Sequence, residues 1–355
     1  MTKVRVGMVG AAFSAGLHID GYLRSQDLCE VIAVCDRNLQ LAREFAAKHG
    51  ILAVYGEIDE LLKEEEIDVI DICLPNFLHC EVAEKAFASG KHVICEKPLA
   101  TTVEDAARMV AAAARAHKHL YYAEDWLFAP ALIRAQELLK QGAVGKPFYI
   151  KAKECHNGSH SPFAKTIRFC GGGSMIHLGV HPIGFLLALK GKPTEVVAMT
   201  TPGGAGNFVH HDMEGEDWGA ALLRFSDGST ALVETNYITV GGMNDIIEIY
   251  GTEGRLHIDL TMSSPITAYS RVGFDYAIEK ADTTIGWTKP AVDEKLMLGY
   301  VGEIRHFLTA LQQNQPAMEG LRGEDGFAVL QVLAAIYQSA REGRKITLAG
   351  GPLDD

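Results

Sequence analysis

The sequence predicts a two-domain protein: an α/β domain with a parallel sheet and helices on both faces, then an α+β domain with an open, mostly antiparallel sheet. With 355 residues, the chain exceeds what one hydrophobic core usually serves. Short apolar runs alternate with amphipathic stretches up to about residue 125, and strand-like runs separated by turn signals dominate later. We therefore expect domains at 1–125 and 126–355, with room for the last helices to pack back on the first domain.

Six short apolar runs supply the parallel strands of the first domain. They lie at 4–9, 31–35, 52–55, 69–74, 92–95 and 120–123. Helices are predicted at 40–49, ended by Gly50, and at 80–88, ended by Gly90. A third helix, 103–117, is predicted to begin at Thr101, which forms a capping box with Glu104.

The second domain has a different order of predicted helices and strands. A helix at 130–141 leads into a strand at 147–153 and a stretch rich in glycine and histidine at 155–173. The strand-like runs of 195–270 are separated by turns such as 226–228 and 251–254, which favours an antiparallel sheet. Two amphipathic helices, at 300–312 and 324–342, follow.

Composition excludes several classes of partner. A formal net charge of -12 and the lack of any basic run argue against binding nucleic acid or an anionic membrane surface. The sequence has neither a signal peptide nor an apolar segment of about 20 residues, so we expect a cytoplasmic protein without a membrane span. Seven cysteines without a CxxC pair suggest buried free thiols in a reducing compartment.

The first strand runs into a loop that resembles a dinucleotide-binding turn. The loop, Gly10, Ala11, Ala12, Phe13, Ser14 and Ala15, has the pattern GxAxxA in place of GxGxxG. Glycine and alanine suit the tight turn and the approach of a pyrophosphate. Asp36, at the end of the second strand, is placed to bind the ribose hydroxyls, which favours NAD. Arg37 leaves NADP open, because a guanidinium can pair with a 2'-phosphate.

Further elements give the chain a family resemblance. With Gly10 to His18 and Asp36, they are Leu74, Pro75 and Asn76 with His79, the Glu96-Lys97-Pro98 element, Gly171 to Gly173 with His181, and the turn at 251–254. Together they resemble the Gfo/Idh/MocA oxidoreductases over nearly the whole chain. The Glu-Lys-Pro element is the most specific part.

The resemblance implies a Rossmann domain and a second domain whose open sheet commonly supports dimers or tetramers. It implies a nicotinamide cofactor and a small carbohydrate or polyol substrate such as a sugar, inositol or glycoside. By position, Leu74, Pro75, Asn76, His79 and Glu96 would line the nicotinamide and its ribose. For two of them a structural role is the alternative, with Leu74 in the core and His79 as a helix cap.

Lys97 and His181 are the predicted catalytic pair. Hydride transfer from a secondary alcohol needs a base for the hydroxyl proton and a group that stabilises the developing alkoxide. Lys97 follows a parallel strand at its carboxyl end, where open α/β sheets bind ligands. His181 matches the family's proton acceptor. The alternatives are a surface lysine and a packed helix histidine.

His177 departs from the family, which has an aspartate four residues before the histidine; Gly184 replaces a second common aspartate. In one hypothesis His177 shares proton transfer with His181. In the other, the two histidines lie on one helix face and hold a metal, joined by His156, Glu154, Cys155, His160 or Glu124. We favour a site without a metal, in which His156 and His160 bind substrate hydroxyls.

Three more side chains are expected near the cofactor or substrate. Glu124 and Trp126 would face the nicotinamide, and Trp126 would also stack on a sugar ring. Arg168 would hold an acidic or polyhydroxylated substrate, with a surface salt bridge as its alternative.

The leading hypothesis is an NAD(P)-dependent dehydrogenase or reductase acting on CH–OH groups, with Lys97 and His181 at the reacting oxygen. A lyase or glycosidase-like enzyme that retains its nicotinamide for transient oxidation is one alternative. A non-catalytic dinucleotide sensor is the other, although a sensor has no need of an acid–base pair.

Overall fold

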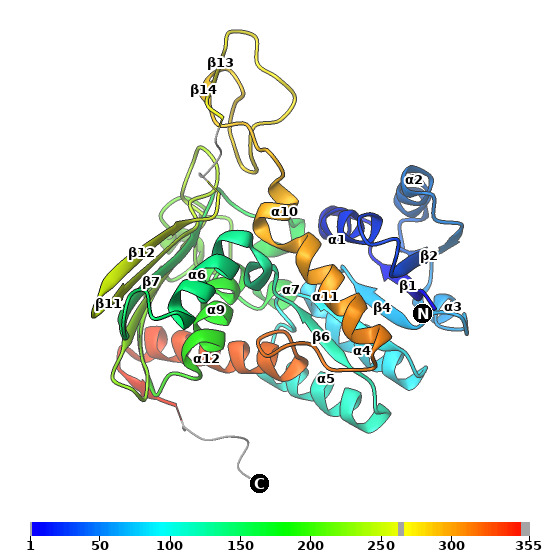
Figure 1. Cartoon of the computed structure of the whole chain (residues 1–355), viewed down its shortest axis with the longest axis horizontal. Helices are drawn as coiled ribbons and strands as arrows, with labels where there is room; N and C mark the ends of the chain where they lie inside the picture. The colour runs from blue at the N-terminus through cyan, green and yellow to red at the C-terminus, as the bar shows by residue number, and fades with distance from the viewer. Residues whose placement is uncertain (1, 262–265, 349–355) are drawn as a thin grey trace. The chain divides into compact units, whose positions relative to one another are not determined.

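The computed structural model describes residues 2–261 and 266–348, and the chain divides into two compact units (Figure 1). The first unit comprises Met1–Asp125 and Gly299–Leu330. The second unit comprises Trp126–Leu298 and Gln331–Asp355.

The first unit is built on a six-stranded parallel sheet in the order β3-β2-β1-β4-β5-β6. This is the strand order of a Rossmann domain, so the predicted fold class is confirmed. Helices α1 and α11 pack together, as do α4 and α5. The strands are β1 (Val4–Val9), β2 (Cys29–Cys35), β3 (Ala53–Tyr55), β4 (Val69–Ile72), β5 (His92–Glu96) and β6 (Leu120–Ala123). The helices are α1 (Phe13–Leu23), α2 (Leu39–His49), α3 (Ile58–Leu61), η1 (Asn76–Leu78), α4 (His79–Ala88), α5 (Val103–Ala116) and α11 (Tyr300–Gln312).

Helix ends in this unit follow local side-chain chemistry. Gly50 ends α2 in the left-handed conformation, with φ of 73°, as predicted. The predicted start of α5 was wrong by one residue, because Thr102 and not Thr101 is the N-cap. The Thr102 hydroxyl accepts a hydrogen bond from the Asp105 amide at 3.1 Å.

The second unit contains a seven-stranded sheet in the order β12-β11-β7-β10-β9-β8-β15. Only β7 and β10 pair in parallel within this described sheet, so the mostly antiparallel prediction is confirmed. The strands are β7 (Pro147–Cys155), β8 (Glu195–Thr200), β9 (Trp218–Arg224), β10 (Thr230–Asn236), β11 (Ile246–Gly251), β12 (Gly254–Asp259) and β15 (Ile346–Thr347), with a separate pair β13 (Ala268–Ser270) and β14 (Gly286–Thr288). The helices are η2 (Asp125–Phe128), α6 (Pro130–Lys140), η3 (Pro162–Lys165), α7 (Ile167–Cys170), α8 (Ser174–His177), α9 (Val180–Lys190), η4 (Gly204–Gly206), α10 (Glu294–Leu298) and α12 (Gly323–Glu342). Of these, η2 and α12 begin in residues of the first unit and end in the second.

The chain bends between His177 and His181, which corrects the expectation that both lie on one helix face. His177 ends α8, whereas His181 lies in the first turn of α9. Pro182 has no amide hydrogen to donate back to Leu178, so a continuous helix is interrupted and α9 begins at Val180. No single described helix is long and apolar enough to cross a membrane; the pair Ile167–His177 and Val180–Lys190 reaches that length and composition only together, with a bend of 57°.

All seven cysteines are buried and free, which confirms the predicted thiols. Burial raises the pKa of Cys35 and of Cys73 to about 12. These thiols are therefore protonated and unreactive at neutral pH in the folded protein.

A buried charge network ties α1 to the sheet of the first unit. His18 Nδ1 lies 3.0 Å from each oxygen of Asp71, and Tyr22 donates a hydrogen bond to the same carboxylate at 3.0 Å. On its other side, His18 Nε2 lies 3.1 Å from Glu96 Oε1. Burial opposes the charged form of His18, but the Asp71 carboxylate outweighs it and raises the pKa of His18 well above its ordinary value. The imidazolium is thus held between two carboxylates.

Glu303, on α11, is a second buried ionisable group in this unit. Its side chain is fully buried, and neither carboxyl oxygen has a hydrogen-bond partner among the described residues. Burial, with the nearby Asp125 carboxylate, raises the pKa of Glu303 well above its ordinary value. Glu303 is therefore neutral at pH values where an exposed glutamate is charged.

Replacing Glu303 by Gln should make the protein's stability less sensitive to rising pH. Above about pH 4.3 the unfolded chain ionises Glu303 while the folded protein keeps it protonated, so wild-type stability falls as the pH rises toward the folded-state pKa. In urea unfolding at about pH 5 and about pH 8, the free energy of unfolding of Glu303→Gln minus that of wild type should increase with pH. The exposed Glu319→Gln is the matched control and should show no such trend. A difference for Glu303→Gln that is equal at both pH values would contradict the assignment.

Candidate functional site

The turn between β1 and α1 has the backbone geometry of a dinucleotide-binding loop. Gly10 has φ of +102°, and a Cβ there would lie 2.1 Å from the carbonyl oxygen of Cys73. Helix α1 begins at Phe13 with Ala12 as an N-cap that provides no side-chain hydrogen bond. The side chain of Ala12 thus does not cap α1, and a helix start of this kind suits a pyrophosphate.

Asp36 shapes this loop through its carboxylate. Its carboxylate accepts hydrogen bonds from the amides of Ala11, at 3.0 Å, and Asn38, at 2.8 Å. The half-buried carboxylate retains lone pairs for ribose hydroxyls. Ser14 is half-buried in the first turn of α1, and Arg37 is exposed next to Asp36. The described residues of this loop thus fit a bound dinucleotide.

His79 connects the two loops at the carboxyl ends of β4 and β5. Its side chain is fully buried, with Nε2 2.9 Å from the carbonyl oxygen of Leu74 and Nδ1 3.0 Å from that of Pro98. Burial lowers the pKa of His79, so the ring is neutral and donates one of these hydrogen bonds at a time. Leu74, Pro75 and Asn76 remain half-buried along the loop that His79 fixes.

Lys97 is held by its main chain at the end of β5. Glu96 Oε2 accepts a hydrogen bond from the Lys97 amide at 2.9 Å, while Glu96 Oε1 faces His18. A cis peptide bond joins Lys97 to Pro98, and the Lys97 side chain is half-buried. Glu124 follows β6 at the same edge of the sheet and is buried. The first unit thus brings Glu96, Lys97 and Glu124 to the carboxyl edge of neighbouring parallel strands, as predicted for a ligand site.

Tyr237 is the centre of a histidine cluster in the second unit. Its hydroxyl lies 2.6 Å from His177 Nδ1, and its carbonyl oxygen accepts a hydrogen bond from His210 Nε2 at 2.7 Å. The ring of buried His156 packs at a centroid distance of 5.5 Å. Burial raises the pKa of Tyr237 well above its ordinary value, so the phenol stays protonated.

Tyr237 was not predicted as a site residue, although its position at the end of a strand-like run is visible in the sequence. Tyr237 directly follows β10, and His156 directly follows β7. These two strands pair in parallel, so the residues after them meet at one edge of the sheet. Predicting that meeting required the strand pairing, which the sequence does not state.

His181 lies beside Trp126 and Glu154 in the second unit. Its ring stacks on Trp126 at 5.5 Å with an interplanar angle of 16°, and its Nε2 lies 3.8 Å from Glu154 Oε2. Trp126 is only 2% exposed. In the structure Trp126 thus packs on the imidazole, and its expected stacking on a sugar ring stays a prediction. Glu154, considered before only as a metal ligand, provides a carboxylate near the histidine.

The triple glycine allows Glu216 and Tyr337 to approach the backbone closely just before α8. A Cβ on Gly173 would lie 1.9 Å from the Glu216 carbonyl oxygen, and one on Gly172 would lie 2.2 Å from the Tyr337 hydroxyl. The Glu216 carboxylate accepts hydrogen bonds from the amides of Gly173 and Met175, at 3.0 and 2.8 Å. Glu216 thereby fixes the start of the helix that ends at His177.

Two further predicted residues, Arg168 and His160, have contacts other than those around Tyr237. Arg168 is exposed on α7 with its guanidinium 5.9 Å from the centre of the Phe169 ring. His160 is exposed and lies 2.8 Å from Glu279 Oε1. Among the described residues of the second unit, no three His, Cys, Asp or Glu side chains bring ligand atoms within 4.8 Å of one another. Of the proposed metal ligands, those that lie in the second unit do not form such a group by themselves.

Comparison with known proteins gives the same family that the sequence motifs indicate. Residues 4–124 match the model described as an oxidoreductase family with an NAD-binding Rossmann fold, and residues 132–257 match the C-terminal domain of Gfo/Idh/MocA proteins.

Relatives of known name extend the similarity over nearly the full chain. D-apiose dehydrogenase of Paraburkholderia graminis is 28% identical, over 98% of this chain and 90% of its own. D-glucoside 3-dehydrogenase of Escherichia coli is 26% identical, over 98% of both chains. The crystal structure of GenD2 from gentamicin A biosynthesis, in complex with NAD, superimposes with a TM-score of 0.90 at 25% identity and covers 99% of this chain and 97% of that one. The chain therefore belongs to the Gfo/Idh/MocA family of oxidoreductases, with an NAD-binding Rossmann domain at its N-terminus.

Proposed function

We propose that this NAD-dependent oxidoreductase acts on a secondary hydroxyl of a sugar, polyol or glycoside, with Lys97 and His181 as its catalytic residues. The observation that carries the proposal is the fixation of Lys97 at the end of β5, where Glu96 accepts its amide hydrogen and is itself held by His18. The names of two relatives, D-apiose dehydrogenase and D-glucoside 3-dehydrogenase, support a carbohydrate substrate.

The residues of the first unit would hold the cofactor. The first amides of α1 suit the pyrophosphate, and Asp36 suits the ribose hydroxyls, which favours NAD over NADP. Bound NAD would supply the acceptor for the hydride. The Lys97 ammonium then stabilises the oxygen of the reacting carbon as negative charge develops on it.

His181 is the proposed base for the hydroxyl proton. Stacking on Trp126 restricts the orientation of the imidazole, and the Glu154 carboxylate favours the cationic ring that forms when the proton is taken. Glu154 would thus supply the negative charge that His177 cannot. His177, bonded to the Tyr237 hydroxyl, is assigned to binding a substrate hydroxyl and to assisting proton transfer.

The main test is a panel of sugars, inositols, sugar acids and glycosides assayed for nicotinamide absorbance with NAD and with NADP. Lys97→Met should lower kcat/KM on the best substrate by about 10²- to 10⁴-fold, because the alkoxide loses its cationic neighbour. Exposed Lys63→Met is the control and should match wild type.

Other outcomes of this panel separate the alternatives. Product formation without net NADH favours a lyase-like reaction with retained cofactor, and NAD binding without any turnover favours a sensor. Loss of activity with a chelator would overturn the metal-free assignment.

Glu154→Gln should lower kcat/KM by roughly tenfold or more, because the amide keeps the shape of the side chain but not its charge. Glu248→Gln, on β11 beside Lys151, removes a carboxylate elsewhere on the same sheet and should leave turnover unchanged.

His177→Asp should preserve or raise dehydrogenase activity, since an aspartate can still accept a hydrogen bond from Tyr237. Full activity of Glu154→Gln, or complete inactivation of His177→Asp, would count against these roles.

We also propose that the outer face of the second unit's sheet pairs copies of the chain into a dimer or tetramer. Val197 and Leu222 lie opposite each other on β8 and β9, and Leu222 lies opposite Leu232 on β10. Val197, Leu222 and neighbouring Met199 are 44%, 48% and 71% exposed. An apolar stripe of this kind is typical of a protein interface.

Leu222→Asp should shift the molar mass measured by light scattering toward that of one chain, because it places a charge in the centre of the stripe. Leu52→Asp, at a leucine that is 94% exposed in the first unit, is the matched control and should keep the wild-type mass. An unchanged mass for Leu222→Asp would place the contact elsewhere.

A cytoplasmic location completes the proposal. Seven buried free thiols suit a reducing compartment.

A further inference from the structure

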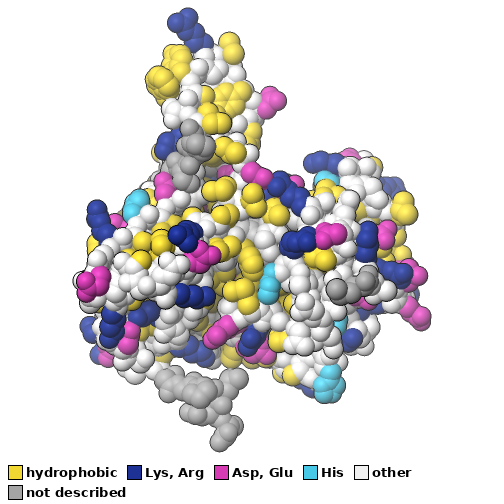
Figure 2. All heavy atoms as spheres, viewed as in Figure 1, with side chains coloured by type: hydrophobic (Ala, Val, Ile, Leu, Met, Phe, Trp, Pro, Cys, Tyr) yellow, Lys and Arg dark blue, Asp and Glu magenta, His cyan; other side chains and the backbone are white. Residues whose placement is uncertain are grey.

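An arm of the second unit, residues 266–293, carries aromatic and apolar side chains on its surface. The antiparallel strands β13 and β14 form its outer part and place Tyr269 opposite Trp287, with ring centroids 5.3 Å apart. Trp287 is 75% exposed. Figure 2 shows apolar side chains gathered over this arm, which Figure 1 labels by β13 and β14. A large exposed tryptophan is costly to leave in water and indicates a binding surface.

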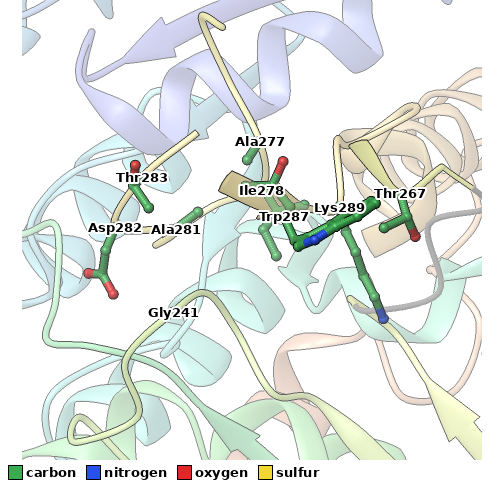
Figure 3. Close-up of a pocket in the computed structure, with 10 residues that line it drawn as sticks. Gly241, Thr267, Ala277, Ile278, Ala281, Asp282, Thr283, Trp287 and Lys289 are labelled. Carbon is green, nitrogen blue, oxygen red and sulfur yellow. The ribbon is translucent and has the colours of Figure 1, made fainter. Parts of the chain in front are cut away.

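A pocket lies beside Trp287, with a volume of about 390 Å³. This volume falls in the range of small-molecule sites. In the view of Figure 3, Asp282 and Thr283 lie on one side, Lys289 lies on the other, and Ile278 and Trp287 lie between them. The lining therefore combines an apolar platform with polar groups around its margin.

The polar groups select for a neutral, hydroxyl-rich ligand. Asp282 and Lys289 carry opposite charges, so the lining favours neither anions nor cations as a class. Asp282 accepts hydrogen bonds, Lys289 donates them, and Thr283 can donate and accept. This set suits alcohol groups, because a hydroxyl also donates and accepts hydrogen bonds. The indole face of Trp287 suits the apolar C–H face of a sugar ring.

Thr288 provides an independent observation. It lines the pocket, and its hydroxyl is buried without a hydrogen-bond partner among the described residues. Buried hydroxyl groups are normally hydrogen-bonded, so this one calls for a partner from outside the described chain.

The base of the arm contacts the loop that carries His156. Lys280 Nζ donates a hydrogen bond to the Gly158 carbonyl at 3.1 Å, and Glu279 Oε1 lies 2.8 Å from His160 Nε2. Gly241, in the segment after Tyr237, also lines the pocket. Residues between the lining positions Ile278 and Ala281 thus contact the loop after His156, and the lining itself includes the segment after Tyr237.

We propose that this pocket is a second sugar subsite, which binds an uncharged pyranose-sized ring next to the one that is oxidised. The inference rests on the proposed function and narrows its substrate to glycosides and oligosaccharides whose second unit is a sugar. The ring stacks on Trp287, and its hydroxyls bond to Asp282, Thr288 and Lys289.

The test compares cellobiose and maltose with glucose. Trp287→Ala should lower kcat/KM for the disaccharides by about tenfold relative to its effect on glucose, because only the disaccharide reaches the indole. Val272→Ala is the control, since Val272 is 90% exposed on the same arm and does not line the pocket. It should match wild type on all three sugars.

A binding measurement separates this inference from the proposed function. Saturation-transfer NMR without cofactor should detect cellobiose or maltose on the wild-type protein and a loss of that signal for Trp287→Ala and for Asp282→Asn. Equal signals for wild type and Trp287→Ala, or none from either disaccharide on wild type, would overturn the subsite whatever the turnover assay gives. A lower molar mass for Trp287→Ala would also overturn it, because a second copy of the chain would then cover the indole.

Discussion

The Glu96 carboxylate is fixed from two sides, and the position of the Lys97 main chain at the end of β5 depends on this. One oxygen lies 3.1 Å from the buried His18 ring, and the other accepts the Lys97 amide at 2.9 Å. His18 is in turn held by Asp71, so that α1, β4 and β5 are joined through one imidazolium. A buried charge is tolerated only when it is paired in this way. The position of Lys97 is thus set by a side chain, His18, that lies far from it in the sequence.

In the proposed mechanism, two residues of the second unit would share the roles that the family resemblance assigns to one aspartate. His177 occupies the aspartate's position but bonds to Tyr237, while the carboxylate near His181 comes from Glu154 on β7. This arrangement depends on the parallel pairing of β7 and β10, which brings Glu154 and Tyr237 to one sheet edge. A loss of charge at one helix position is thereby matched by a carboxylate from a strand.

The fold and the cofactor end could be predicted from the sequence because their signals are local. Gly10, Asp36 and the Glu96-Lys97 pair each lie at a fixed place relative to a strand that its apolar run reveals. The arrangement around His177 and His181 could not be predicted in full, because it depends on contacts between segments far apart in sequence; the interruption between the two helices has a local signal in Pro182, which the prediction did not use. The helix spacing of four residues therefore suggested a shared face that the structure does not have. The stack of Trp126 on His181 could not be predicted for the same reason, since His181 lies 55 positions later.

The distribution of the seven cysteines gives each unit its own chemical reporter. Cys29, Cys35, Cys73, Cys80 and Cys95 lie in the first unit, and Cys155 and Cys170 lie in the second. In the folded state their burial and raised pKa values keep them from alkylating reagents. Labelling at a given cysteine thus requires the surrounding structure to open. The rates at which the two groups are modified would therefore measure how independently the two halves of the molecule open and close.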